Sequence, residues 1–379
     1  MSAIVLARAI AHTVFAHPHL ITWYLRSRGR RKAVLNEMRS GSTTSPQPMG
    51  ITLKPTFSCN LRCSMCSYAA SGAVEAHPRD SLPVDVWARL IDEAAPYKPY
   101  IWFTGGEPTL YPGFIPLLRV ARERGLLCGV TTNGTTLERL ATEIAEAPMH
   151  VLVVSVDGGP EVHSRVRGIP NAYRRMEAGL EALRQACRKR RVAGPALVVN
   201  CSMSPDNYRD AAAVADLARR FGGECINVQH LWMITEEMVR AHNERWGHQY
   251  RLDPNEVVTG GVPDMNPAVV LESIAAIKAA AGGMPMFVHP DLSDEETRIY
   301  YTEPHKFVHR APTACAWMNT DVLPNGDISP CFGVVCGNIT RDRLMDVWNG
   351  AEFRAHRERL SAEGDLPICA RCCAYWRRD

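Results

Sequence analysis

Three cysteines follow one another closely near the start of the chain, as Cys59, Cys63 and Cys66. Cysteine thiolates are the usual ligands of iron–sulfur clusters. Three of them on one loop can hold a four-iron cluster and leave one iron open, as a Lewis-acid position for a bidentate ligand. A zinc knuckle or buried structural cysteines are the alternatives, although zinc usually takes a fourth protein ligand and none lies nearby in the sequence.

A second group of six cysteines lies in the last 65 residues: Cys315, Cys331, Cys336, Cys369, Cys372 and Cys373. Thirteen cysteines are many for an ordinary cytosolic enzyme, and the odd number argues against complete disulfide pairing within the chain. Metal or cluster ligation is therefore the leading interpretation. The remaining four, Cys128, Cys187, Cys201 and Cys225, fall in or beside predicted helices and strands, and we expect them to pack as small apolar side chains.

The elements that position the first three cysteines alternate between strand-like and helix-like patterns. Six apolar segments, at 51–54, 100–104, 129–132, 150–155, 196–200 and 225–229, are separated by amphipathic helical patterns. This alternation predicts an α/β fold with a parallel sheet and right-handed crossovers. Six units are fewer than the eight of a closed barrel, so we predict an open, partial (β/α)6 barrel.

The sequence divides into four predicted parts. Residues 1–49 form an apolar and basic helical segment with a linker, and residues 50–231 form the barrel. Residues 232–310 lose the alternation and are interpreted as a connecting or substrate-shaping insert. Residues 311–379 form a small cysteine-rich domain, in which a Pro-Asn-Gly-Asp turn at 324–327 predicts a β-hairpin.

Polar motifs fall at the ends of the predicted strands. The second strand ends in Thr104-Gly105-Gly106-Glu107-Pro108, and the third in Thr131-Thr132-Asn133-Gly134. The fourth ends in Ser155-Val156-Asp157-Gly158, with His163 and Arg167-Gly168 beyond it, and the fifth ends at Asn200. The carboxyl ends of parallel strands are where α/β barrels place their active sites.

In this order behind the three cysteines, the motifs resemble the radical S-adenosylmethionine (radical SAM) superfamily over residues 51–230. The resemblance implies a [4Fe–4S] cluster on Cys59, Cys63 and Cys66, with SAM bound at its open iron. It implies that the Gly105–Pro108 motif (Gly105, Gly106, Glu107 and Pro108) holds the methionine ammonium, and that Arg167 contacts the SAM carboxylate. The other expected SAM contacts are Thr132, Asn133, Ser155, Asp157 and Asn200. Met65 departs from the pattern, because many members carry an aromatic residue there.

The tail resembles the SPASM/twitch auxiliary-cluster domain that often follows such a barrel. The short tail favours a single auxiliary [4Fe–4S] cluster. The preferred ligands are Cys315, Cys331, Cys369 and Cys372, with Cys336 and Cys373 as alternates. Structural zinc is the alternative.

The implied activity is reductive cleavage of SAM to a 5′-deoxyadenosyl radical that abstracts a substrate hydrogen, with the auxiliary cluster aiding oxidation or substrate positioning. An electron donor such as flavodoxin or ferredoxin is the expected partner. Gln229 and His230 end the sixth strand and are candidates to face the substrate. That substrate could be a ribosomal peptide, a sugar that is oxidised or epimerised, or a lipid-linked molecule. An iron–sulfur electron-transfer protein and a structural zinc protein are the non-enzymatic alternatives.

Charge gives no case for a nucleic-acid partner, because the net charge is only +3. The basic residues gather at the N-terminus, where residues 1–40 contain seven Lys and Arg side chains and one Glu. The apolar stretch there is too interrupted for a transmembrane helix and is a poor signal peptide. We expect a cytoplasmic protein whose N-terminal helix either packs on the main domain or makes peripheral contact with an anionic membrane surface.

Overall fold

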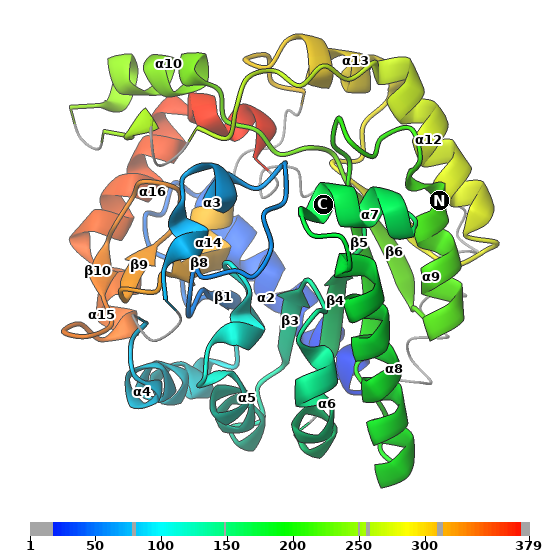
Figure 1. Cartoon of the computed structure of the whole chain (residues 1–379). Coiled ribbons are helices and arrows are strands. Elements are labelled where there is room, and N and C mark those ends of the chain that lie inside the picture. Colours follow the sequence, from blue (N-terminus) through cyan, green and yellow to red (C-terminus); the bar gives the residue numbers. More distant parts are fainter. Residues whose placement is uncertain are drawn as a thin grey trace.

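One ten-stranded sheet runs through the computed structural model, which describes residues 18–77, 81–147, 149–248, 251–254, 258–308 and 314–372. The strand order is β10-β9-β8-β1-β2-β3-β4-β5-β6-β7 (Figure 1). All pairs from β8 to β7 are parallel, and β8-β9-β10 are antiparallel. The strands are β1 (Gly50–Leu53), β2 (Tyr100–Phe103), β3 (Cys128–Thr132), β4 (Val151–Ser155), β5 (Ala196–Ser202), β6 (Cys225–Gln229), β7 (Met286–His289), β8 (Asn319–Val322), β9 (Asp327–Ser329) and β10 (Gly337–Asn338).

Helices connect the parallel strands and lie along one side of the sheet (Figure 1). The barrel helices are α4 (Val84–Ala94), α5 (Phe114–Glu123), α6 (Leu137–Glu146), α7 (Pro160–Arg167), α8 (Ala172–Arg190) and α9 (Val214–Phe221). The others are α2 (Pro18–Arg39), α3 (Ser67–Ala70), α10 (Glu236–Trp246), α12 (Pro267–Ala280), α13 (Asp294–Thr302), α14 (Cys315–Met318), α15 (Leu344–Trp348) and α16 (Ala351–Glu363). A 3-10 segment at Pro367–Arg371 carries Cys369, and Cys372 directly follows it.

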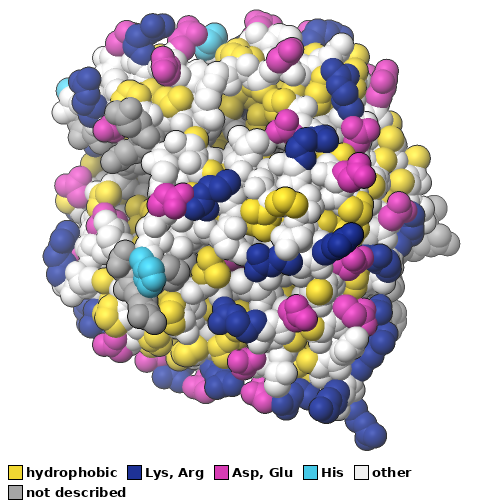
Figure 2. Space-filling model, viewed as in Figure 1, with side chains coloured by type: hydrophobic (Ala, Val, Ile, Leu, Met, Phe, Trp, Pro, Cys, Tyr) yellow, Lys and Arg dark blue, Asp and Glu magenta, His cyan; other side chains and the backbone are white. Residues whose placement is uncertain are grey.

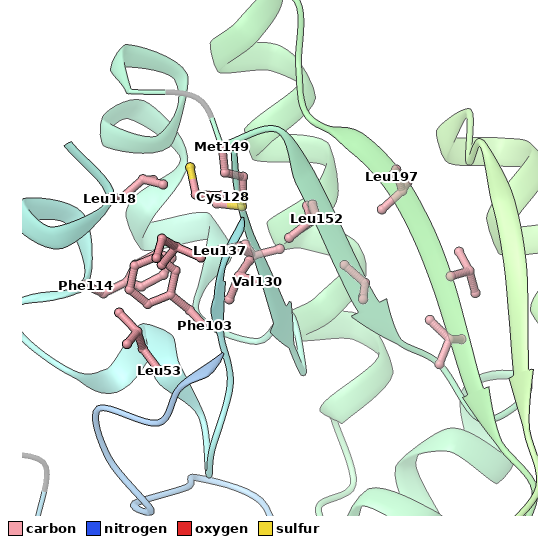
Figure 3. Packing of buried hydrophobic residues seen from close by; sticks show 14 of the residues in the cluster. Leu53, Phe103, Phe114, Leu118, Cys128, Val130, Leu137, Met149, Leu152 and Leu197 are labelled. Atoms are coloured by element: carbon pink, nitrogen blue, oxygen red, sulfur yellow. The ribbon is translucent and has the colours of Figure 1, made fainter. Parts of the chain in front are cut away.

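The apolar core lies between the sheet and these helices. Leu53, Phe103 and Val130 lie on neighbouring strands, are fully buried and point toward the helices (Figure 3). There the Phe103 ring meets the Phe114 ring of α5 edge to face, with centroids 5.5 Å apart. Side chains alternate across a strand, so the opposite face carries Thr52, Trp102 and Thr131, which are only partly buried. This less apolar face and the carboxyl ends of the strands are left to form a site.

The predicted partial barrel of parallel strands is confirmed, and β1 to β6 overlap the six predicted segments. The hairpin in the tail is also present, since Asp321 pairs with Ser329 and Val322 with Ile328 across β8 and β9. The segment at 232–310, which is interpreted as a connecting or substrate-shaping insert, contains helices and the strand β7. β7 lengthens the parallel sheet beside β6, and β8 lengthens it beside β1. The sheet therefore crosses both predicted boundaries of that segment.

A second apolar cluster joins the N-terminal helix to the tail. Val34 of α2 packs there with Met238 and Trp246 of α10 and with Trp317 of α14. The expected N-terminal helix is thus present from Pro18 and is docked on the molecule through its second half. The part of the predicted segment at 1–17 lies outside the described residues. Within the described range, no helix combines the length and apolar character needed to cross a membrane.

Candidate functional site

A pocket of about 210 Å³ opens at the carboxyl ends of the central strands. It brings together all three cysteines of the first group and most of the predicted SAM contacts. Its lining includes Cys59, Cys63, Met65, Cys66, Gly105, Gly106, Glu107, Thr132, Asn133, Ser155, Arg167 and Ser202. Pro108, Asp157, Asn200, Gln229 and His230 are not among the residues that line it. Ser202 was not predicted, because a lone serine at a strand end carries no distinctive signal.

Two glycines allow β2 to end against the loop that leads to Cys59. A Cβ on Gly106 would lie 2.1 Å from the Phe57 carbonyl oxygen, and one on Gly105 would lie 2.5 Å from the Thr56 carbonyl oxygen. Gly105 also has a φ of +125°, which L side chains rarely adopt. The amide of Gly106 donates to the Thr56 carbonyl at 3.0 Å. The paired glycines therefore hold the cysteine loop against the sheet.

The opposite side of the cysteine loop rests on the end of α7. The amide of Arg62 donates to the Arg167 carbonyl at 3.2 Å, and the amide of Ser64 donates to the Val166 carbonyl at 3.0 Å. Gly168 ends the helix with a φ of +75°, and a Cβ there would lie 2.5 Å from the Arg62 carbonyl oxygen. The Arg167-Gly168 pair thus has a structural task that the sequence did not reveal, since it docks the loop between Cys59 and Cys66.

Glu107 is buried, and its carboxylate accepts four hydrogen bonds from neighbouring residues. Its Oε1 accepts from the Thr132 hydroxyl at 2.7 Å, the Thr109 hydroxyl at 2.5 Å and the Thr109 amide at 3.2 Å. Its Oε2 accepts from the Asn133 amide at 2.7 Å. Burial raises the pKa of Glu107, and these hydrogen bonds oppose the rise. The carboxyl group thereby ties β2 to the end of β3 on the floor of the pocket.

Donors also surround the sulfur of Cys59. The amide of Leu61 lies 3.4 Å from Cys59 Sγ, and Asn133 Nδ2 lies 3.9 Å from it. Asn133 Nδ2 also donates to Asn60 Oδ1 at 3.0 Å. Burial raises the pKa of the Cys59 thiol to about 12. Metal binding needs the thiolate, and these donors suit a thiolate better than a neutral thiol.

Asp157 and Arg167 form a buried ion pair next to Cys63. Arg167 Nε lies 2.6 Å from Asp157 Oδ2, and Arg167 Nη1 donates toward Cys63 Sγ at 3.6 Å. Asp157 Oδ1 accepts from the Ser202 amide at 3.3 Å. Burial raises the pKa of Asp157 and Arg167 opposes the rise, whereas burial lowers the pKa of His163 to about 3 and Arg167 lowers it further. The predicted SAM contacts Asp157 and Arg167 are thus engaged with each other.

A ladder of amide side chains continues from the pocket across β5 and β6. Asn227 Nδ2 donates to Asn200 Oδ1 at 2.5 Å, and Asn200 Nδ2 donates to Gln229 Oε1 at 3.4 Å. His230 lies apart from this ladder, buried against α13, with Nδ1 2.9 Å from the Tyr301 hydroxyl. Burial lowers the pKa of His230 to about 3, and His289 adds to the effect. Catalytic roles for Gln229 and His230 stay predictions.

The tail cysteines fall into two environments. Burial raises the pKa of Cys369, and the nearby thiols of Cys331 and Cys315 raise it further, so these three lie within electrostatic reach of one another. Cys336 lies elsewhere, where Glu352 adds to the rise in its pKa and Arg357 opposes it. Cys372 lies beside Cys369, to whose carbonyl it donates its amide at 3.1 Å. The alternate ligand Cys373 lies outside the described residues.

A lysine missed by the sequence analysis lies beside this second group. Lys54 Nζ is 2.6 Å from Asp321 Oδ2. Burial alone would lower the pKa of Lys54, but Asp321 and Tyr68 outweigh it and leave the pKa above its ordinary value. Lys54 ends the predicted short strand at 51–54, where a polar residue is ordinary, and its acidic partner lies far away in the sequence.

The donor set of the first cysteine group fits an iron–sulfur cluster. Among the described residues, no three His, Cys, Asp or Glu side chains converge closely enough to hold one metal ion. An iron–sulfur cluster takes its thiolates from separate positions around a larger body. The convergence of Cys59, Cys63 and Cys66 on one pocket, with donors at the sulfurs, suits such a group.

Comparison with known proteins agrees with this geometry. Residues 53–224 match the model of the Radical SAM superfamily, and residues 315–373 match that of SPASM, described as an iron–sulfur cluster-binding domain. The chain is 30% identical over 350 residues to the AdoMet-dependent heme synthase of Oleidesulfovibrio alaskensis, covering 90% of this chain and 85% of that protein. It is 25% identical over 344 residues to the PqqA peptide cyclase of Ruegeria pomeroyi, covering 87% of this chain and 80% of that protein.

A solved structure supports the fold. SuiB of Streptococcus suis, bound to S-adenosylmethionine, superposes with a TM-score of 0.61 at 16% identity, covering 92% of this chain and 77% of that chain. Motif order, pocket and relatives agree on the family and on the enzymatic character of its members. The chain therefore belongs to the radical SAM superfamily and ends in a SPASM domain, and its cofactors are S-adenosylmethionine, a [4Fe–4S] cluster that binds it, and an auxiliary [4Fe–4S] cluster.

Proposed function

We propose that this protein cleaves SAM reductively and uses the resulting radical to oxidise a substrate. The observation that carries the proposal is the convergence of Cys59, Cys63 and Cys66 with Glu107 and Arg167 on one pocket. When bound there, the cluster and SAM supply a 5′-deoxyadenosyl radical that abstracts a hydrogen atom from the substrate. A reducing partner such as flavodoxin or ferredoxin would supply the electron.

The residues of the chain have separate tasks in this proposal. The three cysteines hold the cluster, and the two glycines and Gly168 keep their loop in place. Glu107 carries negative charge to the floor of the pocket, where it attracts the ammonium of SAM. Ser155 and Ser202 line the same pocket near the ends of β4 and β5 and offer hydroxyl groups to the ribose.

The auxiliary cluster is assigned to Cys315, Cys331, Cys369 and Cys372. The mutual electrostatic influence of Cys315, Cys331 and Cys369 supports this set over one that includes Cys336. A second cluster beside the barrel can accept an electron from a substrate radical, so an oxidation is the net reaction that we favour.

For the substrate we propose a heme precursor, a tetrapyrrole. The relative that is 30% identical is named a heme synthase, and the chain covers 85% of it. A peptide is the second candidate, because PqqA peptide cyclases are also similar over most of their length. Both classes are larger than the pocket at the cluster, so the substrate would extend toward the tail domain.

Metal content and product analysis test this proposal. After anaerobic reconstitution we expect about eight irons and eight sulfides per chain, because two cubane clusters hold four irons each. Replacing Cys59, Cys63 and Cys66 by Ala should remove about half of the iron and abolish formation of 5′-deoxyadenosine, whereas Cys187→Ala, in α8, should change neither. Retained SAM cleavage in the triple variant would refute the assignment.

Incubation with deuterated candidates tests the substrate. A deuterated porphyrin precursor of heme and a deuterated precursor peptide are each supplied with SAM and reductant, and 5′-deoxyadenosine is examined by mass spectrometry. Deuterium transferred from the porphyrin supports the first candidate, and deuterium from the peptide supports the second.

A further inference from the structure

Lys54 occupies a buried position between the two groups of cysteines. It follows β1 directly and is 9% exposed. Besides its contact with Asp321, the ammonium bonds to the Tyr68 side chain and lies 5.6 Å from the centroid of the Phe332 ring. An ammonium donates up to three hydrogen bonds and accepts none, so it can hold several acceptors at once.

Each neighbour of Lys54 is tied to a cluster-binding segment. Tyr68 lies on α3, two residues after Cys66, and its ring stacks on Phe57 with centroids 4.7 Å apart. Phe332 directly follows Cys331 and stacks on Trp232 with centroids 4.9 Å apart. Figure 1 shows α3 near the ends of β1 and β8, the strand that carries Asp321. Lys54 therefore contacts the segment after Cys66 on one side and the segment after Cys331 on the other.

The charge of Lys54 is not needed to join these elements. β1 and β8 already pair in parallel through Gly50 to Leu53, and the amide of Lys54 donates to the Val322 carbonyl at 2.9 Å. Replacing a buried ion pair by apolar residues is often neutral for stability or favourable. A buried ammonium at this point must therefore be explained by something other than strand pairing.

A charge so placed acts on a neighbouring cluster. A cluster held by thiolates is anionic, and one-electron reduction makes it more so, which a nearby cation favours and a nearby carboxylate opposes. Charges, hydrogen bonds and solvent exposure around a cluster are the means by which a protein sets its potential. Lys54 Nζ lies 5.6 Å from the ring centroid of Phe332, the residue next to Cys331, and the carboxylate of Asp321 lies 2.6 Å from the same ammonium, so charges of both signs lie beside this ligand segment.

We propose that Lys54 is a positioning residue that raises the reduction potential of the auxiliary cluster, and that Asp321 moderates this effect. The inference rests on the proposed cluster ligands Cys315, Cys331, Cys369 and Cys372. It assigns to Lys54 the task of making the cluster a better acceptor for the electron released from an oxidised substrate.

Potentiometric titration of the reconstituted holoenzyme tests the proposal. Each cluster takes up one electron from the reductant and passes from the 2+ to the 1+ state, which is followed by electron paramagnetic resonance. SAM perturbs the signal of the cluster at Cys59, Cys63 and Cys66, so the remaining signal belongs to the auxiliary cluster. Lys54→Met should make its reduction at least tenfold less favourable, a fall of about 59 mV.

The variants at Asp321 and the charge-conserving variant sharpen the test. Asp321→Asn should shift the potential upward, and Lys54→Arg should stay near the parent value. Arg119→Met removes a cation from an exposed ion pair with Glu146 and serves as the control, with no shift expected. If Lys54→Met fails to assemble both clusters, the upward shift in Asp321→Asn is still required. The double variant of Asp321→Asn with Lys54→Arg should show the same upward shift, because it keeps the positive charge.

Two results would overturn the inference. If both clusters assemble but Lys54→Met and Asp321→Asn leave the potential of the auxiliary cluster unchanged, or both shift it in the same direction, the Lys54–Asp321 ion pair only links β1 to β8. If the parent protein binds about four irons and the tail variants lose none, the proposed ligand set is wrong and the inference falls with it. Iron analysis of the same samples separates the two cases.

Discussion

The guanidinium of Arg167 lies between Asp157 and Cys63, with Nε 2.6 Å from Asp157 Oδ2 and Nη1 3.6 Å from Cys63 Sγ. The side chains of Asp157 and Arg167 are both buried. The backbone carbonyl of Arg167 also accepts a hydrogen bond from the amide of Arg62. One residue thus neutralises a buried carboxylate, faces a cluster ligand and docks the loop between the ligands. Arg167 therefore contributes to the structure of the site in addition to its expected contact with SAM.

Removal of Arg167 should therefore cost stability as well as activity. Arg167→Met leaves Asp157 buried without its partner, which typically costs about 3–5 kcal/mol of unfolding free energy. Denaturant unfolding of the reconstituted protein measures this loss. Adding Asp157→Asn to the same chain removes the uncompensated charge and should recover much of it. A single variant as stable as the parent would contradict the importance of the pair.

Glu107 provides a separate test of SAM anchoring. Glu107→Ala should keep the iron of both clusters, because the carboxylate accepts its hydrogen bonds from Thr109, Thr132 and Asn133 and from none of the cysteines. It should weaken SAM binding by about 1.5–3 kcal/mol, the scale of a lost hydrogen bond to a charged group. Equilibrium dialysis under anaerobic conditions measures the affinity.

The control for this test is Glu146→Ala, which removes an exposed carboxylate from α6. It should leave SAM binding unchanged. Normal SAM affinity in Glu107→Ala would show that the methionine ammonium does not lie at the Gly105–Pro108 motif.

The sequence predicted those features that depend on local pattern. Apolar runs and helical periodicity placed β1 to β6, and cysteine spacing with strand-end motifs identified the pocket. The edge strand β7 was not predicted, because it is only four residues long and none of them is fully buried. It also lies between a Gly-Gly pair and Pro290, which are typical of loops. Contacts between distant segments were also not predicted, such as Lys54 with Asp321 and Arg167 with Cys63, because a local sequence pattern does not show which distant residues meet in the fold.

His230 makes stability depend on pH. Burial holds its pKa near 3, against an ordinary value of about 6.5, so the folded protein keeps the imidazole neutral. As the pH falls from about 6.5 toward 3, His230 binds a proton in the unfolded chain but stays neutral in the folded protein. The free energy of unfolding therefore decreases. His230→Gln should therefore flatten the decline of the melting temperature between pH 7 and pH 5.5.

The matched control is His305→Gln, whose imidazole is 54% exposed beside Glu237. It should retain the slope of the parent. Because His163 and His356 are also buried with lowered pKa values, His230→Gln should reduce the slope without removing it. A slope identical to that of the parent would argue that His230 is protonated in the folded state.

The tail cysteines allow the sharpest separation of ligand from bystander. Cys331 and Cys336 both lie in the segment after the hairpin, yet Cys331 is within electrostatic reach of Cys315 and Cys369, whereas Cys336 neighbours Glu352 and Arg357. Cys331→Ala should remove about half of the iron, since four of eight irons belong to the second cluster. It should also expose residues 314–372 to limited proteolysis, because metal binding contributes folding free energy to a small domain. Cys336→Ala should retain the iron and the protection from proteolysis.

SAM cleavage should persist in both variants, because the ligands of the first cluster all precede residue 67. Substrate oxidation should fail only in Cys331→Ala. Loss of iron in Cys336→Ala with full iron in Cys331→Ala would exchange the two assignments, and zinc in place of iron in the tail would remove the auxiliary cluster from the mechanism.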